Sequence, residues 1–433
     1  MELTTTQSIS GGPETTNMKA LSTATVLFFM WGFLTCLNDI LIPHLKMVFE
    51  LSYAQAMLIQ FAFFSSYFVF AIPSGKLVDF IGYKRTMIAG LLTMAVGALL
   101  FLPAASLAAF PLFLAALVVL AAGITALQVA ANPYVANLGP QRTASSRLNL
   151  AQAFNSLGTT VAPYVGSALI LGAATVEAPR LGSLTQAALQ QFRAQQASTV
   201  RLPYLGIAGL LILLAVALAV IKLPPMGGLT QDFRPDERGS SWGALLGHPQ
   251  LLLGAVGIFL YVGAEVTIGS FLVNYMHLPE ISGFTEAVAA RYVSIYWLGA
   301  MIGRFVGSAV LQKVKTSKLL ALAATAACLL VLLSMLSTGH TAMWSILAVG
   351  LFNSIMFPSI FTLGIANLGE LTSKGSSLMV CAIVGGAVIP LFSGFVADKI
   401  GVQHALMVAA ACYVYIVIFG LRGDHSATEH RAA

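Results

Sequence analysis

The sequence predicts an all-α polytopic membrane protein with twelve transmembrane helices in two pseudo-symmetric six-helix bundles. Of its 433 residues, 58% are hydrophobic and only 9% are charged, whereas a soluble domain carries about 25% charged residues. Its mean hydropathy is +0.86. Apolar runs long enough to cross a bilayer, which takes about 20 residues in a helix, follow one another along the chain. Short sequence echoes between the two halves of the chain support the pairing of bundles.

The spans are read from apolar runs separated by short polar loops. They are expected at 21–43, 53–75, 84–104, 108–131, 147–173, 202–222, 249–276, 287–311, 317–337, 342–366, 375–397 and 402–421. A polar segment over 222–247 divides them six and six. The expected organisation is a tail (1–20), a first bundle (21–222), a linker (223–248), a second bundle (249–422) and a tail (423–433). No small-residue cleavage site follows a short apolar region, so we expect the first span to be retained.

The basic residues predict the orientation. If both termini are cytoplasmic, sixteen Lys and Arg residues, Arg304 among them, fall on the inside and six on the outside. This is the positive-inside bias of membrane proteins. The net charge of +6 then follows from topology, and it does not indicate a nucleic-acid partner.

Two sequence echoes relate the halves. Residues 136–139 and 366–369 both read Ala-Asn-Leu-Gly, at an offset of 230. A Gly-x-x-x-Asp-x-x-Gly pattern begins at Gly75 and again at Gly394. Internal repeats of this kind are typical of alternating-access transporters, whose substrate site lies at mid-membrane between the repeats.

The segment after the second span, Gly75–Arg85, is read as a loop and resembles the G-x-L-x-D-x-x-G-x-K/R-R/K loop of the major facilitator superfamily. Glycines permit a tight turn and close helix approach. An acid there can meet a helix N-terminus or a basic partner and hold one conformation. We therefore expect a conformational latch, against the alternative of a solvated charged loop, formed by Gly75, Asp79, Gly82, Lys84 and Arg85.

The first span carries an acid within its apolar run. Asp39 follows Asn38, and Trp31, Thr35 and Asp39 are spaced four apart and form one helical stripe. A carboxylate at membrane depth costs about 2.5–3.5 kcal/mol on insertion scales, so such acids are rare and usually functional. We expect Asp39 to bind a proton or ion and Asn38 to contact substrate. The alternative is that Asp39 reaches interfacial water.

The seventh span holds a second acid, Glu265, deep within its run. At the offset of 230 it corresponds to Thr35, one turn from Asp39 on the same stripe. Two acids on equivalent helices indicate one shared coupling site. Two separate structural acids remain the alternative.

Carboxamides give the clearest indication of a polar substrate. Asn149, Gln152 and Asn155 recur every three residues in the fifth span, and they are costly toward lipid. Amides donate and accept hydrogen bonds, as a ring of hydroxyls requires. Interhelical hydrogen bonding is the alternative. The remaining expected substrate residues, polar or aromatic and within spans, are Gln60, Gln128, Trp297 and Asn353.

Enzyme and receptor functions find little support. No His pairs with a Cys, Asp or His at ligand or catalytic spacing within a span, so we expect no metal site, no cofactor and no enzymatic activity. The four cysteines all lie in apolar runs without metal-binding spacing. The short termini leave little room for a signalling domain.

Several segments together resemble one branch of the superfamily, the fucose–galactose–glucose:cation symporters. They are Leu37–Leu41, Ala130–Pro133, Arg147–Ser156, Gly303–Phe305 and Gly364–Gly369. The resemblance implies a secondary transporter that imports a hexose by cation symport, with Asp39 as the coupling acid. It further implies a functional monomer in the bacterial cytoplasmic membrane, whose partners are hexose, cation and lipid.

One departure from fucose permeases narrows the substrate. They have an acid where this chain has Gln128, and glutamine where it has Glu265, whereas glucose/galactose-type members share the Tyr261–Glu265 pattern. This favours glucose or galactose, with H⁺ slightly favoured over Na⁺. The alternatives are a Na⁺-coupled symporter, a fucose or N-acetylglucosamine permease, and, from other classes, a drug efflux pump or an intramembrane enzyme.

Overall fold

A computed structural model describes residues 15–49, 53–107, 109–166, 201–224 and 242–422. Within those ranges, the side chains of Thr35, of residues 37–60 and of a few other residues are not described. All regular elements of the described residues are helical. In the first half they are α1 (Met18–Phe49), α2 (Tyr53–Ser106), α3 (Phe110–Ala136), η1 (Gln141–Thr143), α4 (Ala144–Gly166) and α6 (Arg201–Val220).

The second half begins with η5 (Trp242–Gly247) and continues through helices that match the six remaining predicted spans. They are α7 (Pro249–His277), α8 (Glu286–Val310), α9 (Thr316–Leu336), α10 (Gly339–Asn353), α11 (Met356–Gly364), η6 (Gly369–Leu371), α12 (Thr372–Cys381), η7 (Ala382–Val384), α13 (Gly385–Ile400), α14 (Val402–Ala405) and α15 (Met407–Arg422). Predicted spans ten and twelve are each broken into two helices, and predicted span eleven consists of α12, η7 and α13.

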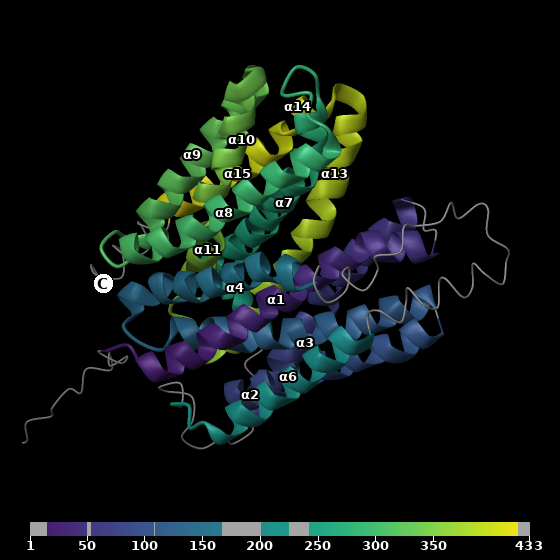
Figure 1. Ribbon diagram of the computed structural model, residues 1–433. Helices are drawn as coiled ribbons and strands as arrows, with labels where there is room; N and C mark the ends of the chain where they lie inside the picture. Colours follow the sequence, from purple (N-terminus) through teal and green to yellow (C-terminus); the bar gives the residue numbers. More distant parts are fainter. Residues whose placement is uncertain (1–14, 50–52, 108, 167–200, 225–241, 423–433) are drawn as a thin grey trace, which may run out of the picture.

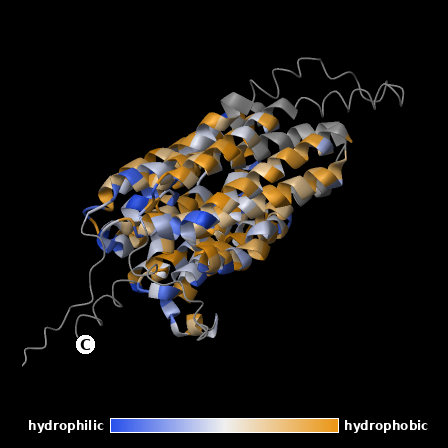
Figure 2. Cartoon of the chain, turned by 90° about the horizontal axis from the view of Figure 1, so that it is seen from below, coloured by the Kyte–Doolittle hydropathy of each residue, from blue (hydrophilic) through white to orange (hydrophobic). Residues whose placement is uncertain are grey.

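The helices have the apolar character of membrane spans. Among the described residues, eight helical stretches are long and apolar enough to cross a membrane, and Met18–Leu34 and Tyr204–Val220 are shorter apolar helices. One of the eight, Phe61–Ala104, covers predicted spans two and three. Large apolar side chains such as Leu213 and Leu336 are exposed, as expected of a lipid-facing surface. Figure 2 shows hydrophobic residues along most of the helices.

The segment predicted as the loop after the second span is largely helical. Gly75 to Ile81 continue α2, so the loop prediction is wrong there, and the chain turns at Gly82 alone (φ 81°, ψ 166°). Only glycine adopts this backbone conformation at low cost. The echo of this motif in the second half has the same device, since Gly401 ends α13 with φ 85° and ψ 157°. The sequence repeat is thus also a repeat of backbone geometry.

Two prolines free backbone carbonyls that other helices then use. Proline has no N–H, so the carbonyl four residues earlier loses its intrahelical partner. Ahead of Pro133, the freed Val129 carbonyl accepts a bond of 2.8 Å from Ser376 Oγ of α12. Pro358 likewise frees the carbonyl of Ser354, at the break between α10 and α11. That carbonyl accepts a hydrogen bond of 3.4 Å from Arg304 Nε of α8.

The helices gather into two groups. Helix α2 packs along α3 and α6, and α1 packs along α4, while α7 to α15 pack among themselves. The two groups meet through α4 with α8 and through α2 and α3 with α12. In Figure 1 they form a V whose arms diverge from the region of α4 and α11.

Most side-chain hydrogen bonds between the groups lie toward one face, which we call the terminal face. This face includes the turns at Gly82 and Gly369. It also includes Asn17, whose backbone N–H donates to Leu138 O (3.0 Å). Serine and threonine hydroxyls bond across the two groups there. These bonds are Ser145 to Thr362 (2.5 Å), Thr316 to Ser145 (2.9 Å), Ser146 to Ser308 O (2.7 Å) and Ser376 to Val129 O.

Candidate substrate and ion site

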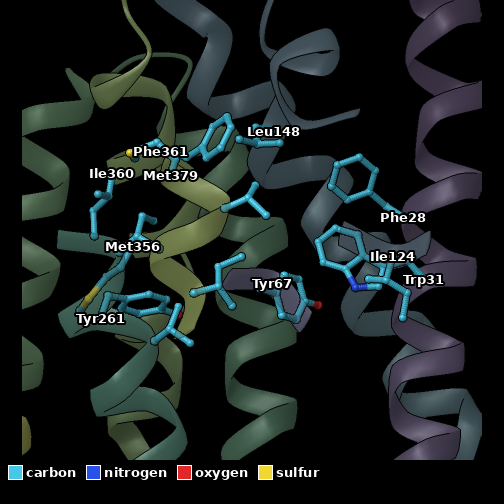
Figure 3. Close-up of a cluster of buried hydrophobic side chains, with 14 of the residues drawn as sticks. Phe28, Trp31, Tyr67, Ile124, Leu148, Tyr261, Met356, Ile360, Phe361 and Met379 are labelled. Atoms are coloured by element: carbon cyan, nitrogen blue, oxygen red, sulfur yellow. The ribbon is translucent and has the colours of Figure 1, made fainter. Parts of the chain in front are cut away.

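An amide and two aromatic rings meet in the first half. Gln128 of α3 is buried, and its Nε2 donates to the Tyr67 hydroxyl of α2 at 2.9 Å. The same hydroxyl bonds with Trp31 of α1, and Figure 3 shows the two rings side by side. The Oε1 of Gln128 is buried without a hydrogen-bond partner. The cluster thus presents aromatic faces together with a free acceptor, a combination suited to a sugar.

The three carboxamides of α4 do not converge on one point. Asn149 Nδ2 donates across the groups to the carbonyl of Arg304 (2.7 Å). Asn155 Nδ2 instead donates to Phe28 O of α1 (3.0 Å), where α1 and α4 pack closely. Gln152, between them in sequence, is buried. In this state Asn149 and Asn155 make interhelical hydrogen bonds, while each keeps an oxygen that can accept another.

Glu265 belongs to a tyrosine–amide network of the second half. Its Oε1 accepts a bond from the Tyr261 hydroxyl (2.8 Å), one turn earlier on α7. Tyr261 also lies within bonding distance of Asn353 O (3.0 Å). Both ends of the Asn353 amide are engaged, since its Nδ2 donates to Tyr296 (2.8 Å) and its Oδ1 accepts from Tyr413 (2.8 Å). Asn353 therefore positions Tyr261, and through it Glu265, in this state.

Arg304 joins this network to the other group. Its side chain is half-buried within α8, and its Nη1 donates to Ser156 of α4. Its Nε donates to Ser354 O, the carbonyl freed by Pro358. The positive charge also acts on Glu265 through space. Arg304 is thus a residue of the bundle interior and not a loop residue, so the positive-inside count becomes fifteen to six.

The other predicted site residues differ in how far the structure describes them. Asn38 and Asp39 lie within the continuous helix α1, and Gln60 lies within α2, but their side chains fall outside the described residues. Trp297 of α8 is 42% exposed, packs edge-on against Tyr296 at 5.1 Å between ring centroids, and approaches Gly269 of α7.

The predicted latch residues contact two different neighbours. Asp79 accepts a hydrogen bond from Ser373 of α12, and Gly75 packs directly against Ser377 of the same helix. Lys84 instead donates to Ala219 O of α6 (2.8 Å), within its own group. Arg85 is exposed. Two of the five residues therefore bridge the groups, one braces the first group, and Gly82 supplies the turn.

Three features of the site were missed by sequence reasoning. Arg304 is a charged residue inside the predicted span 287–311. The argument that singled out Asp39, that a charge within the membrane is costly and usually functional, applies equally to Arg304. Tyr67 lies seven residues after Gln60 in the second span, on the same helical face. The partners of Asn353 are 57 and 60 residues distant in sequence, and no local pattern indicates them.

Comparison with known proteins extends this description. The model of the Major Facilitator Superfamily matches residues 21–383. The chain is 50% identical over 407 residues to the glucose/galactose transporter of Brucella abortus, covering 94% of each chain. It is 36% identical to the L-fucose-proton symporter of Escherichia coli, covering 93% of this chain and 92% of that one.

Solved structures agree with the sequence relatives. The E. coli transporter FucP, solved in the outward conformation, superposes with a TM-score of 0.86 at 35% identity, covering 93% of this chain and 98% of that one. The proton:xylose symporter XylE, at 13% identity and a TM-score of 0.65, shares the fold. The protein is therefore a multi-pass membrane protein of the transporter class, and it belongs to the Major Facilitator Superfamily.

Proposed function

We propose that this chain is a hexose:cation symporter of the bacterial cytoplasmic membrane that imports glucose and galactose. The observation that carries the proposal is the 50% identity to the Brucella glucose/galactose transporter over 94% of both chains. The cluster of aromatic rings and an amide formed by Trp31, Tyr67 and Gln128 supports a sugar as cargo, because a pyranose has both apolar faces and hydroxyl edges. An apolar drug would leave those amides unpaired.

The two acids are proposed to couple sugar movement to the cation. Asp39 lies on the α1 stripe two turns beyond Trp31, and Glu265 is held by Tyr261 next to the charge of Arg304. A carboxylate that gains and loses a cation changes the charge of the site, which can bias the equilibrium between two conformations. We favour the proton as the coupling ion, in keeping with the L-fucose-proton symporter relative.

We propose the two helix groups, residues 21–222 and 249–422, as the bodies that rock past one another. In the described state, contacts through Asp79, Ser376 and Asn149 close the terminal face. We assign this face to the cytoplasm from the basic residues, which makes the state outward-open. Lys84 and the glycine turns support the bodies, and the transporter is proposed to act as a monomer without a cofactor other than the co-transported ion.

A competition assay tests the substrate. Purified protein in proteoliposomes takes up labelled glucose while galactose, fucose, mannose or N-acetylglucosamine competes, with Na⁺ present or replaced by K⁺. The proposal predicts strong competition by galactose, weak competition by fucose, and uptake that follows a proton gradient without Na⁺. Preferred uptake of fucose or N-acetylglucosamine would contradict the proposed substrates. Strict Na⁺ dependence would contradict the proton as the coupling ion.

A further inference from the structure

Several polar side-chain atoms are buried without a hydrogen-bond partner. Among the described residues, six such side-chain atoms occur, on α2, α3, α4 and α11. Asn132 is the extreme case, because both its Nδ2 and its Oδ1 are unbonded while the residue is 0% exposed. Leaving a buried amide unpaired costs about 1–3 kcal/mol, so native proteins rarely retain one without a use.

The position of Asn132 on α3 shows where its side chain is directed. Gly90 and Gly97 of α2 pack against Gly123, Leu127 and Leu120 of α3. At 100° per residue, Asn132 lies on the opposite side of the helix from this packed face. It shares that side with Gln128, one turn away.

This side of α3 faces the contact that must break when the groups separate. Ser376 of α12 bonds to Val129 O, between Gln128 and Asn132 in sequence. On α4, the Oδ1 of Asn149 is also buried and without a hydrogen-bond partner. The Nδ2 of Asn149 donates to the backbone carbonyl of Arg304, which belongs to the other group. Breaking these bonds opens the side of α3 that carries both amides.

We propose that Asn132 is a sugar-binding residue of the opposite state, part of an exit subsite between Gln128 and the terminal face. Its ligand is a polyhydroxylated compound, since an amide pairs with hydroxyls as donor and acceptor at once. The closed state leaves the amide without partners, and opening supplies them from water or from the passing sugar. The substrate class rests on the proposed function, whereas the opening of this side of α3 does not.

Transport measured from each side tests the subsite. Asn132→Ala is expected to raise the half-saturation concentration for sugar at the terminal face about tenfold or more, while the value at the opposite face stays unchanged. The matched control is Thr125→Ala, on the same side of α3, because the Thr125 hydroxyl is already bonded to Ala121 O (2.8 Å). Equal changes at both faces, or no change, would overturn the exit subsite.

Folding and sugar identity are separated by two further measurements. Asn132→Leu is expected to melt no lower than wild type, because it removes an unpaired amide from the closed state; a lower melting temperature would show that the amide stabilises the fold. Asn132→Cys is expected to react with a charged thiol reagent applied at the terminal face, and transported sugar should slow the reaction. Leu120→Cys, on the packed face of α3, is the unreactive control.

The outcomes distinguish this inference from the proposed function. If Asn132→Cys never reacts from the terminal face, the side of α3 does not open and the inference fails. If it reacts but no hexose protects it and wild type transports no hexose, the failure belongs to the substrate assignment. If wild type transports glucose yet glucose gives no protection, the opening is a water path and the sugar subsite is refuted.

Discussion

At the scale of single residues, Glu265 is defined by what holds it. Tyr261 donates to its carboxylate, and the same hydroxyl lies 3.0 Å from the backbone carbonyl of Asn353, whose amide is fixed between Tyr296 and Tyr413. A charge in such surroundings is stabilised only by hydrogen bonds and a nearby opposite charge. Tyr261 supplies the hydrogen bond to Glu265, and Arg304 supplies the nearby positive charge. Tyr261 and Arg304 therefore hold the acid in the way that its proposed coupling role requires.

Removing one oxygen from this network should weaken coupling. Tyr261→Phe keeps the ring but loses the hydroxyl that reaches Glu265 and Asn353. Because hydrogen bonds to charged groups contribute about 1.5–3 kcal/mol, uphill sugar accumulation should fall about tenfold with folded protein retained. Tyr275→Phe on the same helix, which loses only its bond to Ser334, is the control for the loss of any buried hydroxyl. Equal accumulation by both variants would remove Tyr261 from the mechanism.

Arg304 should be harder to replace than an exposed arginine. Arg304→Gln removes the charge near Glu265 and the donors to Ser156 and Ser354. Hydrogen bonds from a charged group contribute about 1.5–3 kcal/mol, so active transport should drop by more than tenfold, and Arg304→Lys should recover it only partly because lysine lacks the planar fork. Arg422→Gln, at the exposed end of α15, serves as control. Uptake and detergent-extracted yield are measured together, and normal uptake by Arg304→Gln contradicts the assigned role.

At the scale of elements, proline and glycine interrupt helices at positions where another helix bonds to the freed carbonyl or where the chain turns. Pro133 and Pro358 each free a carbonyl that accepts a hydrogen bond from a side chain of another helix. Gly82 and Gly401 turn the chain at equivalent places with nearly equal dihedral angles. The sequence motif predicted a tight turn in its first copy, and the second copy was found as a sequence repeat. It did not predict that Gly75 to Ile81 stay helical, because a polar run looks alike in a loop and in the end of a helix that extends past the bilayer.

The glycine turn gives a stability test. Gly82→Ala places a Cβ on a residue with φ 81° and ψ 166°, a backbone conformation that costs a non-glycine residue about 1–3 kcal/mol, although nothing lies within 4 Å to clash with it. The melting temperature in detergent should fall, and Gly401→Ala should lower it by a similar amount. Gly206→Ala in the interior of α6, which also meets nothing within 4 Å, should be neutral or stabilising by up to about 1 kcal/mol. A Gly82→Ala protein as stable as Gly206→Ala would refute the turn geometry.

At the scale of the whole molecule, closure of the terminal face rests on small side chains. The hydroxyls of Ser145 and Thr362 lie 2.5 Å apart across the two groups. Each such bond contributes about 0.5–1.5 kcal/mol, which suits an interface that must open in every transport cycle. Gly75 allows the backbones of α2 and α12 to approach closely at the same face.

A disulfide across this contact should stop transport. With Ser145→Cys and Thr362→Cys combined, oxidation should cross-link the groups and abolish sugar exchange, and a reductant should restore it. Each single variant, oxidised in the same way, controls for the four native cysteines. Full exchange by the oxidised, cross-linked double variant would show that the terminal face does not open during transport.

Sequence and structure agree most where the physics is local. Hydropathy placed twelve spans, and the cost of intramembrane polar groups marked Glu265, Gln128 and the amides of α4. Which partner each amide takes could not be predicted, because Asn149 bonds to the carbonyl of residue 304 in the other group. Asp39 stays a prediction, since its side chain lies outside the described residues.

In the proposed mechanism, sugar movement is coupled to a cation through Asp39 and Glu265. The most direct test is glucose accumulation in proteoliposomes under an imposed inside-negative potential, comparing wild type with Asp39→Asn and Glu265→Gln. One charge crossing 100 mV is equivalent to about 2.3 kcal/mol, a gradient of roughly 40–50-fold. Wild type should approach that gradient and lose it on addition of an uncoupler, while Asp39→Asn should still exchange sugar without concentrating it and Glu265→Gln should accumulate less than wild type. Accumulation by Asp39→Asn equal to wild type, or wild-type uptake indifferent to the potential, would contradict the claim.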